Sequence, residues 1–307
     1  MTVRHRRRKK RTVKIIMKVL GCVFGIMLVV GVGLLAKMYF DTRNAFEKTY
    51  KPLKREGSQR NIEKGKPINI LLLGIDSGEK GFNGRSDTMI VAHLNPKKKN
   101  TILLSIPRDT WVEGVSLNKI NSAFADGGAA RTIFVVEKLL DAPIHHYAAL
   151  NFSGIKSLVD VVGGINVNNQ LDFSVGGSHF SRGRLHLNGE ETERYTRMRY
   201  EDPRGDYGRQ ERQRDAITSL IYSLKSTTAL RNYPTILKAL GENVQTDISF
   251  EEMQDLFKDY KGSFDKIESV YLKGSGEMRY NEEMGKNLSY QIVPQSEISR
   301  GHDLLTI

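Results

Sequence analysis

The longest uncharged apolar run in the chain lies near its start. Residues 19–36 read VLGCVFGIMLVVGVGLLA. With the apolar residues that flank it, this run can cross a hydrocarbon core about 30 Å thick, which takes about 20 helical residues. A cleaved signal peptide needs a shorter core and a small-residue cleavage site, and KMYF at 37–40 has no Ala-x-Ala pattern. We therefore expect an uncleaved transmembrane anchor at residues 19–40.

Three apolar runs follow in the body of the chain. INILLLGID at residues 68–76 predicts a buried strand that ends at Gly74. TMIVAHL at 88–94 and TILLSIP at 101–107 predict two more strands, joined by the turn sequence NPKKKN. Because short connections favour antiparallel neighbours, we expect a meander. The end of the first strand, the start of the second and the end of the third then share one edge of the sheet.

Helices and strands alternate through the rest of the chain. The pattern predicts helices at 127–140, 153–162 and 249–261, strands at 147–150 and 267–272, an extended segment from 165, loops or a hairpin at 169–187, and a loose end over the last dozen residues. Ser249 and Glu252 have capping-box spacing. No internal repeat interrupts this order. The predicted fold class is α/β, an α-β-α sandwich with a central mixed sheet, preceded by one N-terminal transmembrane helix.

Charge divides the chain into segments. The formal net charge is +12, but residues 1–18 hold nine Lys or Arg and no acid, which leaves +3 for the remainder. The positive-inside rule keeps this tail in the cytoplasm and places the body outside the cell. We expect a cytoplasmic tail (1–18), the anchor (19–40), a polar stalk (41–67) and an extracellular catalytic domain (68–307). The only cysteine, Cys22, lies in the anchor, so the outer domain forms no disulfide.

Nucleic acid is the partner class that a basic tail first suggests. A nucleic-acid binder needs a broad basic face or interleaved exposed aromatic residues. The small charge of the body and its expected location outside the cell argue against this partner. The basic tail and the apolar run that follows it instead indicate the plasma membrane.

Two carboxylates and an arginine lie at the shared strand edge. Asp76 follows the first predicted strand, Asp87 precedes the second and Arg108 follows the third. Each alone is more often a solvated loop charge, but their convergence favours a site. Two neighbouring carboxylates repel each other unless a cation lies between them, and oxygen ligands suit Mg²⁺ or Mn²⁺. We therefore expect a divalent metal at Asp76 and Asp87.

Seven arginines and four acids stand between Arg194 and Arg214. Arginine is costly to bury without an anionic partner. Arg197 and Arg199 are two residues apart, so on a strand they would share a face. The alternative interpretation is that the four acids neutralise the cluster from within.

A helix is expected after the turn sequence DPRG. Asp206 can cap it, and its apolar stripe places Arg209 and Gln213 on the inward face, with Arg212 near the edge of that face. A helix N-terminus and inward arginines both favour a phosphate. Carboxylates and arginines together indicate a diphosphate site. The sequence has no GxSxG or Walker-type loop, and the pair His145-His146 is interpreted as strand filler.

Several motifs resemble those of the LytR–CpsA–Psr family of cell-envelope enzymes. They are LLLGID (71–76), RSDT (85–88), SIPRDTWV (105–112), KINSAFADGG (119–128), LVDVVGGI (158–165) and RMRYEDPRGDYGRQERQR (197–214). The resemblance implies an α-β-α domain that holds a polyprenyl pyrophosphate lipid, with its isoprenoid chain in an apolar tunnel. It also implies a Mg²⁺-dependent phosphotransferase that moves an anionic glycopolymer, such as wall teichoic acid, from the lipid carrier to peptidoglycan.

The resemblance also implies roles for individual residues. Asp76 and Asp87 would hold the metal, and the catalytic set would be Asp76, Asp87, Arg108 and Arg199. The pyrophosphate contacts would be Arg108, Arg197, Arg199, Arg209 and Gln213, with Asp206 and Arg212 as further contacts or supports. Two other functions use the same residues and stay open at this point: a hydrolase of the lipid diphosphate, and a non-catalytic lipid-binding scaffold of the envelope.

Overall fold

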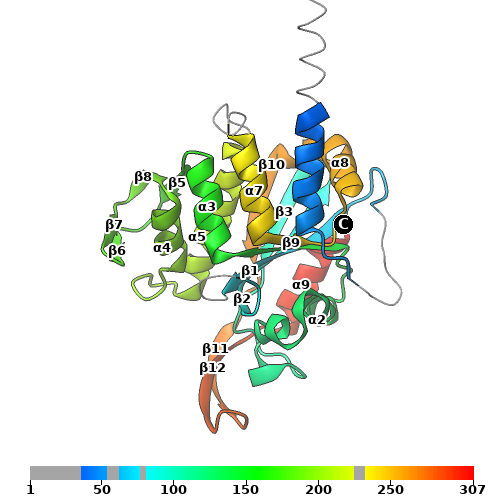
Figure 1. Ribbon diagram of the computed structural model, residues 1–307. Helices are drawn as coiled ribbons and strands as arrows, with labels where there is room; N and C mark the ends of the chain where they lie inside the picture. The colour runs from blue at the N-terminus through cyan, green and yellow to red at the C-terminus, as the bar shows by residue number, and fades with distance from the viewer. Residues whose placement is uncertain (1–35, 54–61, 77–80, 225–231) are drawn as a thin grey trace, which may run out of the picture. The chain divides into compact units, whose positions relative to one another are not determined.

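The computed structural model describes residues 36–53, 62–76, 81–224 and 232–307 (Figure 1). The chain forms two compact units, Met1–Asn44 and Ala45–Ile307. The expected basic tail and most of the expected anchor lie outside the described residues. No helix among the described residues is long and apolar enough to cross a membrane. The larger unit starts within the expected stalk: Lys51, for example, donates its backbone N–H to the carbonyl of Thr246 at 2.7 Å.

A six-stranded mixed sheet forms the centre of the larger unit. Its order is β10-β3-β2-β1-β4-β9, with β1 Ile68–Asp76, β2 Arg85–Asn95, β3 Asn100–Ser105, β4 His146–Asn151, β9 Val244–Thr246 and β10 Lys266–Tyr271. The pairs β1–β2 and β2–β3 are antiparallel, which confirms the predicted meander. The pairs β1–β4 and β3–β10 are parallel, so the sheet is mixed as expected.

Helices cover both faces of this sheet (Figure 1). Alternate residues of β1 point to opposite faces. Leu71 and Leu73 pack in one core with residues of α2 (Ser122–Leu140) and α9 (Gln295–Thr306). Ile68 and Ile70 belong to a second core that includes residues of α5 (Asp206–Ser223) and α8 (Phe250–Asp259). This arrangement confirms the α/β class and the helical layers around the sheet.

Smaller elements surround the sheet. The remaining bounds are α3 Phe152–Val161, α4 Gly189–Arg197, α7 Tyr233–Asn243, β5 Ile165–Asn169, β6 Phe173–Val175, β7 Ser178–Phe180, β8 Gly183–Leu187, β11 Ser275–Asn281 and β12 Lys286–Ile292. The β6–β7 hairpin confirms the hairpin expected within 169–187, and its rings Phe173 and Phe180 stack with centroids 5.0 Å apart. The predicted capping box of Ser249 and Glu252 is present at the start of α8.

The C-terminal end departs from the sequence prediction. The last dozen residues were expected to be loose, but they form α9. Leu305 is buried in the same core as β1, and its carbonyl accepts a hydrogen bond from the Asn69 side chain at 3.1 Å. Gly301 lies close against Leu140 and Leu272, which lets the helix approach the core. A few apolar contacts therefore fix a segment whose composition is polar.

Candidate functional site

One pocket of about 220 Å³ gathers most of the charged residues that the sequence singled out. We call it the arginine pocket. It is lined by Asp76, Asp87, Arg108, Arg197, Arg199, Tyr200, Arg209 and Gln213. The two halves of the predicted site, the strand edge and the arginine cluster, therefore meet in space.

The strand edge supplies one side of the arginine pocket. Asp76 is the last residue of β1, Asp87 lies near the start of β2, and Arg108 follows β3. The β1–β2 register shifts between Gly74 and Ile75, just before Asp76. A side chain at Gly74 would meet Thr88, because an added Cβ would lie 2.9 Å from the Thr88 Cβ. Glycine therefore permits the close strand pairing that brings Asp76 to this edge.

Arg197 and Arg199 reach the arginine pocket from a helix end and not from a strand. Asn188 and Glu191 form a capping box that starts α4, and Arg197 is its last residue. Met198 then turns out of the helix with φ −58° and ψ 132°, and Arg199 follows. The two-residue spacing of Arg197 and Arg199 could not distinguish a strand from a helix end, because both arginines can reach one pocket in either structure. A cation is also favourable in the last turn of a helix.

Arg209 and Gln213 lie on α5, one turn apart. Both side chains are buried and both line the arginine pocket, which confirms the predicted inward face. Asp206 is the first residue of α5, whereas Gly205 occupies the N-cap position. The Asp206 carboxylate does not line the pocket; it pairs with Arg209 and accepts a hydrogen bond from Gln210 at 2.9 Å. Asp206 thus supports Arg209.

Two of the four arginines in the pocket, Arg108 and Arg197, face its two aspartates. Asp87 pairs with Arg108 and accepts a hydrogen bond from the Asn121 side chain at 3.3 Å. Asp76 lies 3.7 Å from the guanidinium of Arg197. Within the described part of the chain, Arg199 forms no ion pair. Four arginines and two aspartates line the pocket, so its lining has a net charge of +2.

The ion pair with Asp206 compensates only part of the cost of burying the Arg209 guanidinium. Burial lowers the pKa of Arg209; Asp206 raises it, and the nearby cations Arg108 and Arg199 lower it again, so the net shift is downward. Its Nε is buried and has no hydrogen-bond partner among the described residues. A bound anion would supply the missing acceptor and offset the repulsion between the guanidinium groups.

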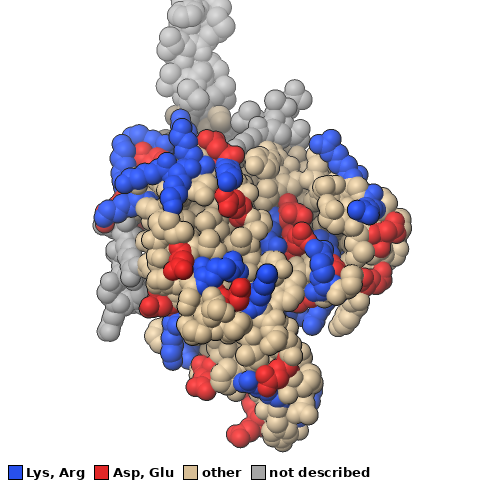
Figure 2. Space-filling model, turned by 180° about the vertical axis from the view of Figure 1, so that it is seen from behind, with Lys and Arg blue, Asp and Glu red and all other residues tan. Residues whose placement is uncertain are grey.

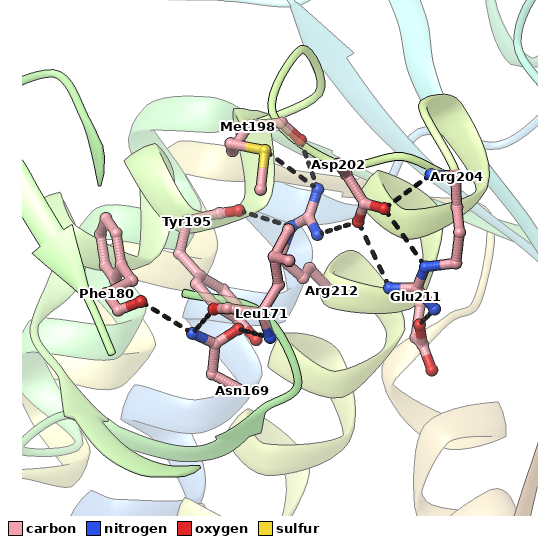
Figure 3. A network of polar contacts seen from close by, with 9 residues as sticks. All are labelled: Asn169, Leu171, Phe180, Tyr195, Met198, Asp202, Arg204, Glu211 and Arg212. Carbon is pink, nitrogen blue, oxygen red and sulfur yellow. Dashed lines mark hydrogen bonds and ion pairs between the residues drawn. The ribbon is translucent and has the colours of Figure 1, made fainter. Parts of the chain in front are cut away.

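Arg212 lies outside the arginine pocket, in a buried network (Figure 3). Its Nε donates to the carbonyl of Tyr195 at 3.1 Å, and its terminal nitrogens donate to the Met198 carbonyl at 2.5 Å and to Asp202 at 2.6 Å. The structure therefore does not bring Arg212 to the position of a direct phosphate contact. It joins α5 to the end of α4, where the chain leads into Arg197 and Arg199.

Asp202 is the anion of this network. Its side chain is 0% exposed and pairs with both Arg212 and Arg204. Burial alone would raise the pKa of Asp202, but hydrogen bonds from Arg212 and Arg204 outweigh it and hold the pKa below the ordinary 3.8. Gly208 faces this carboxylate, and a Cβ there would lie 1.8 Å from an Asp202 oxygen. Three of the four acids, Asp202, Asp206 and Glu211, thus neutralise part of the cluster, as the alternative interpretation held, but none of them pairs with Arg199.

Two residues of the cluster differ from expectation. Arg214 falls off the stripe that holds Arg209 and Gln213, yet it is buried and donates to the Ser105 hydroxyl of β3 at 2.7 Å. Tyr200, which sequence reasoning missed, lines the arginine pocket and is 96% exposed. An aromatic ring directly after Arg199 in a turn was the available signal. His146, expected as strand filler, is buried in β4 near Asp247.

Two carboxylates are available for a metal at this site. Asp76 and Asp87 line the same pocket, but the described residues contain no group of three or more His, Cys, Asp or Glu that could hold an ion. Mg²⁺ characteristically takes one or two protein carboxylates and completes its shell with waters and substrate phosphates. The donor set therefore fits Mg²⁺ or Mn²⁺ bound together with a phosphate ligand, and does not fit a closed protein cage.

The distribution of charge on one face of the molecule can be compared with what a nucleic-acid partner would need. Figure 2 shows Lys and Arg side chains interspersed with Asp and Glu over much of the rear face, with one group of basic side chains toward its upper left. No broad basic surface covers the middle of this face among the described residues. This mixed pattern gives a nucleic-acid backbone little to bind there.

Known proteins resemble this chain over most of its length. The model of the LytR_cpsA_psr family matches residues 36–305. The polyisoprenyl-teichoic acid–peptidoglycan teichoic acid transferase TagU of Enterococcus faecalis is 43% identical, over 92% of this chain and 94% of its own. The crystal structure of TagV of B. subtilis has 34% identity and a TM-score of 0.64, covering 79% of this chain and 97% of that one. TagT bound to LIIa-WTA has 26% identity and a TM-score of 0.68, covering 83% and 98%.

Proposed function

Because the chain belongs to the LytR_cpsA_psr family, we propose that it is a phosphotransferase that moves teichoic acid from a polyprenyl pyrophosphate carrier to peptidoglycan. The observation that carries this proposal is the convergence of four arginines and two aspartates in the arginine pocket. The name of the Enterococcus relative supplies the donor and acceptor classes.

The charge of the arginine pocket suits a diphosphate diester. Such a group has two negative charges, and the pocket lining has a net charge of +2. Arginine forks pair with phosphate oxygens through two parallel hydrogen bonds. Arg199 has no competing ion pair within the described chain, and Arg209 has a buried Nε without an acceptor. These groups are already in position before the ligand arrives.

The reaction that fits this geometry is an in-line phosphoryl transfer. A hydroxyl oxygen of a peptidoglycan sugar forms a bond to the phosphorus that bears the glycopolymer. The bond from that phosphorus to the bridging oxygen breaks, and its electron pair stays on the polyprenyl phosphate that leaves. The hydroxyl proton passes to a carboxylate at the rim of the pocket. Arg197, Arg199 and Arg209 stabilise the charge on the leaving phosphate, so positioning and electrostatics provide most of the rate.

We propose that Asp76 and Asp87 hold Mg²⁺ or Mn²⁺ when the donor binds. Their side chains line the same edge of the pocket, and the arginines would occupy the other side of the diphosphate. When bound, the ion would neutralise diphosphate charge as a Lewis acid. Without it, the two carboxylates would repel the donor phosphates that the arginines attract.

The location of the reaction follows from its acceptor. We propose that residues 19–40 anchor the chain in the plasma membrane, with the N-terminus in the cytoplasm and the catalytic domain outside. The nine cations of residues 1–18 support this orientation through the positive-inside rule. The catalytic domain would then be on the side of the membrane where peptidoglycan lies.

A product analysis with the full chain tests the transfer proposal. We expect a synthetic polyprenyl-pyrophosphate-linked teichoic acid to be joined to peptidoglycan oligomers, with release of polyprenyl phosphate that depends on the oligomers. Chelation of divalent cations should reduce transfer at least about 100-fold, and added Mg²⁺ should restore it. Equal release of polyprenyl phosphate without acceptor would favour a hydrolase. Tight donor binding without any turnover in Mg²⁺ would favour a scaffold.

A further inference from the structure

A second depression of about 520 Å³ meets the arginine pocket at its carboxylate edge. We call it the side groove. Asp76, Asp87 and Arg108 line both depressions. The residues that line only the side groove are Asn83, Gly84, Arg85, Asp109, Lys119, Asn121 and Ala125. The side groove therefore leads from the outer surface to the place where the two carboxylates lie.

The charges of the side groove are balanced. Its lining has three aspartates and three cations, whereas the arginine pocket has an excess of two cations. Asp109 and Lys119 form an ion pair at 2.9 Å, and the Arg108 Nε lies 3.8 Å from Asp109. Asp76 and Asp87 border both depressions, so a metal ion held there would add the same charge to each, and a polyanion such as the donor glycopolymer would still gain more from the arginine pocket. A sugar strand rich in hydroxyl and acetamido groups can instead bind to the carboxylates, amides and cations of the side groove.

The direction of the reaction also points to this groove. In a phosphoryl transfer, the attacking and leaving oxygens lie roughly in line on opposite sides of the phosphorus. Arg197, Arg199 and Arg209 line the arginine pocket but not the side groove. If the leaving phosphate lies among these arginines, the attacking hydroxyl must approach from the opposite side. Asp76 and Asp87, which border both depressions, mark the place where the side groove opens into the pocket and offers such an approach.

From the shared border, the charge balance and the in-line requirement, we propose that the side groove binds the sugar strand of the peptidoglycan acceptor. This inference rests on the proposed transfer reaction and identifies where its second substrate lies. Arg85 and Ala125 are both exposed and line only the side groove, so replacing them removes no side chain from the lining of the arginine pocket.

Two variants of the full chain test this inference. Ala125→Trp fills the groove without changing its charge, and Arg85→Ala removes a cation from its lining. We expect the KM for peptidoglycan oligomers to rise about 10-fold or more in each, as expected for loss of about 1.4 kcal/mol of binding. The KM for the lipid donor should not change. The matched control is Arg184→Ala, an exposed arginine on β8 that lines neither depression.

A binding measurement separates this inference from the transfer proposal. Saturation-transfer NMR with a peptidoglycan disaccharide fragment should show contact with the wild-type chain and with Arg199→Ala, but a weaker signal with Ala125→Trp. Unchanged acceptor KM and unchanged fragment contact in Ala125→Trp would overturn the inference. A rise in donor KM in that variant would also overturn it, because the groove would then hold the donor glycan. If the wild type binds the fragment here but performs no transfer, the transfer proposal fails and the binding site stands.

Discussion

Replacing Arg199 with alanine is expected to lower glycopolymer transfer at least about 100-fold, because it removes a preorganised donor to the reacting phosphates. The melting temperature should stay within about 2 °C of the wild type, since Arg199 forms no ion pair in the described chain. Removal of its charge also relieves repulsion on the buried Arg209. The measurements are transfer with synthetic donor and peptidoglycan oligomers, and thermal unfolding.

Two further variants sharpen this prediction. Arg199→Lys keeps the charge but loses the planar fork, so we expect transfer between that of the wild type and that of Arg199→Ala. Arg184→Ala removes a comparable exposed arginine outside the arginine pocket and should transfer at the wild-type rate. Wild-type transfer by Arg199→Ala would remove this arginine from the mechanism.

Replacing Arg212 with methionine should mainly reduce stability, by about 3–5 kcal/mol at pH 7. The substitution leaves the fully buried Asp202 carboxylate with Arg204 alone and takes a donor from the carbonyls of Tyr195 and Met198. Transfer should fall as well, because these contacts hold the chain where it leaves α4 for Arg199. Denaturant unfolding, with the midpoint and slope compared, measures the loss.

The double variant Arg212→Met with Asp202→Asn isolates the charge contribution. With the carboxylate gone, we expect part of the lost stability to return, since no buried charge is left without its partner. The pH dependence has a defined sign. Because the folded-state pKa of Asp202 is lowered, its stabilisation is present above pH 3.8 and is lost as the pH falls through the folded-state value. Two results would contradict this account. One is a loss of stability in the double variant that equals the sum of the two single losses. The other is a loss of stability in Arg212→Met that stays the same as the pH is lowered.

The sequence was most informative where one strong pattern decided the structure. Long apolar runs joined by short turns specified the β1–β2–β3 meander, and the meander alone placed Asp76, Asp87 and Arg108 together. The stripe of α5 likewise placed Arg209 and Gln213 inward, because the helical period relates them to apolar positions further along.

The sequence was less informative where contacts between distant segments determine the local structure. The spacing of Arg197 and Arg199 indicates a shared face only if they lie on a strand, and the capping box of Asn188 and Glu191 instead makes the segment that ends at Arg197 helical. The sequence alone could not show that Arg209 lines the pocket and Arg212 does not, because both are arginines on the same helix. The partners of Arg212 are two backbone carbonyls and Asp202, which only the folded chain brings near. The helix α9 was missed because a few core contacts outweigh its polar composition.

The central claim is that the arginine pocket binds a diphosphate, and equilibrium binding tests it most directly. A short polyprenyl diphosphate would be titrated, in the presence of Mg²⁺, into the full chain, Arg199→Ala and Asp76→Asn. We expect binding by the wild type, and about 10- to 100-fold weaker binding by each variant, as expected for loss of one charge-assisted contact. Equal affinity in all three proteins would contradict the claim.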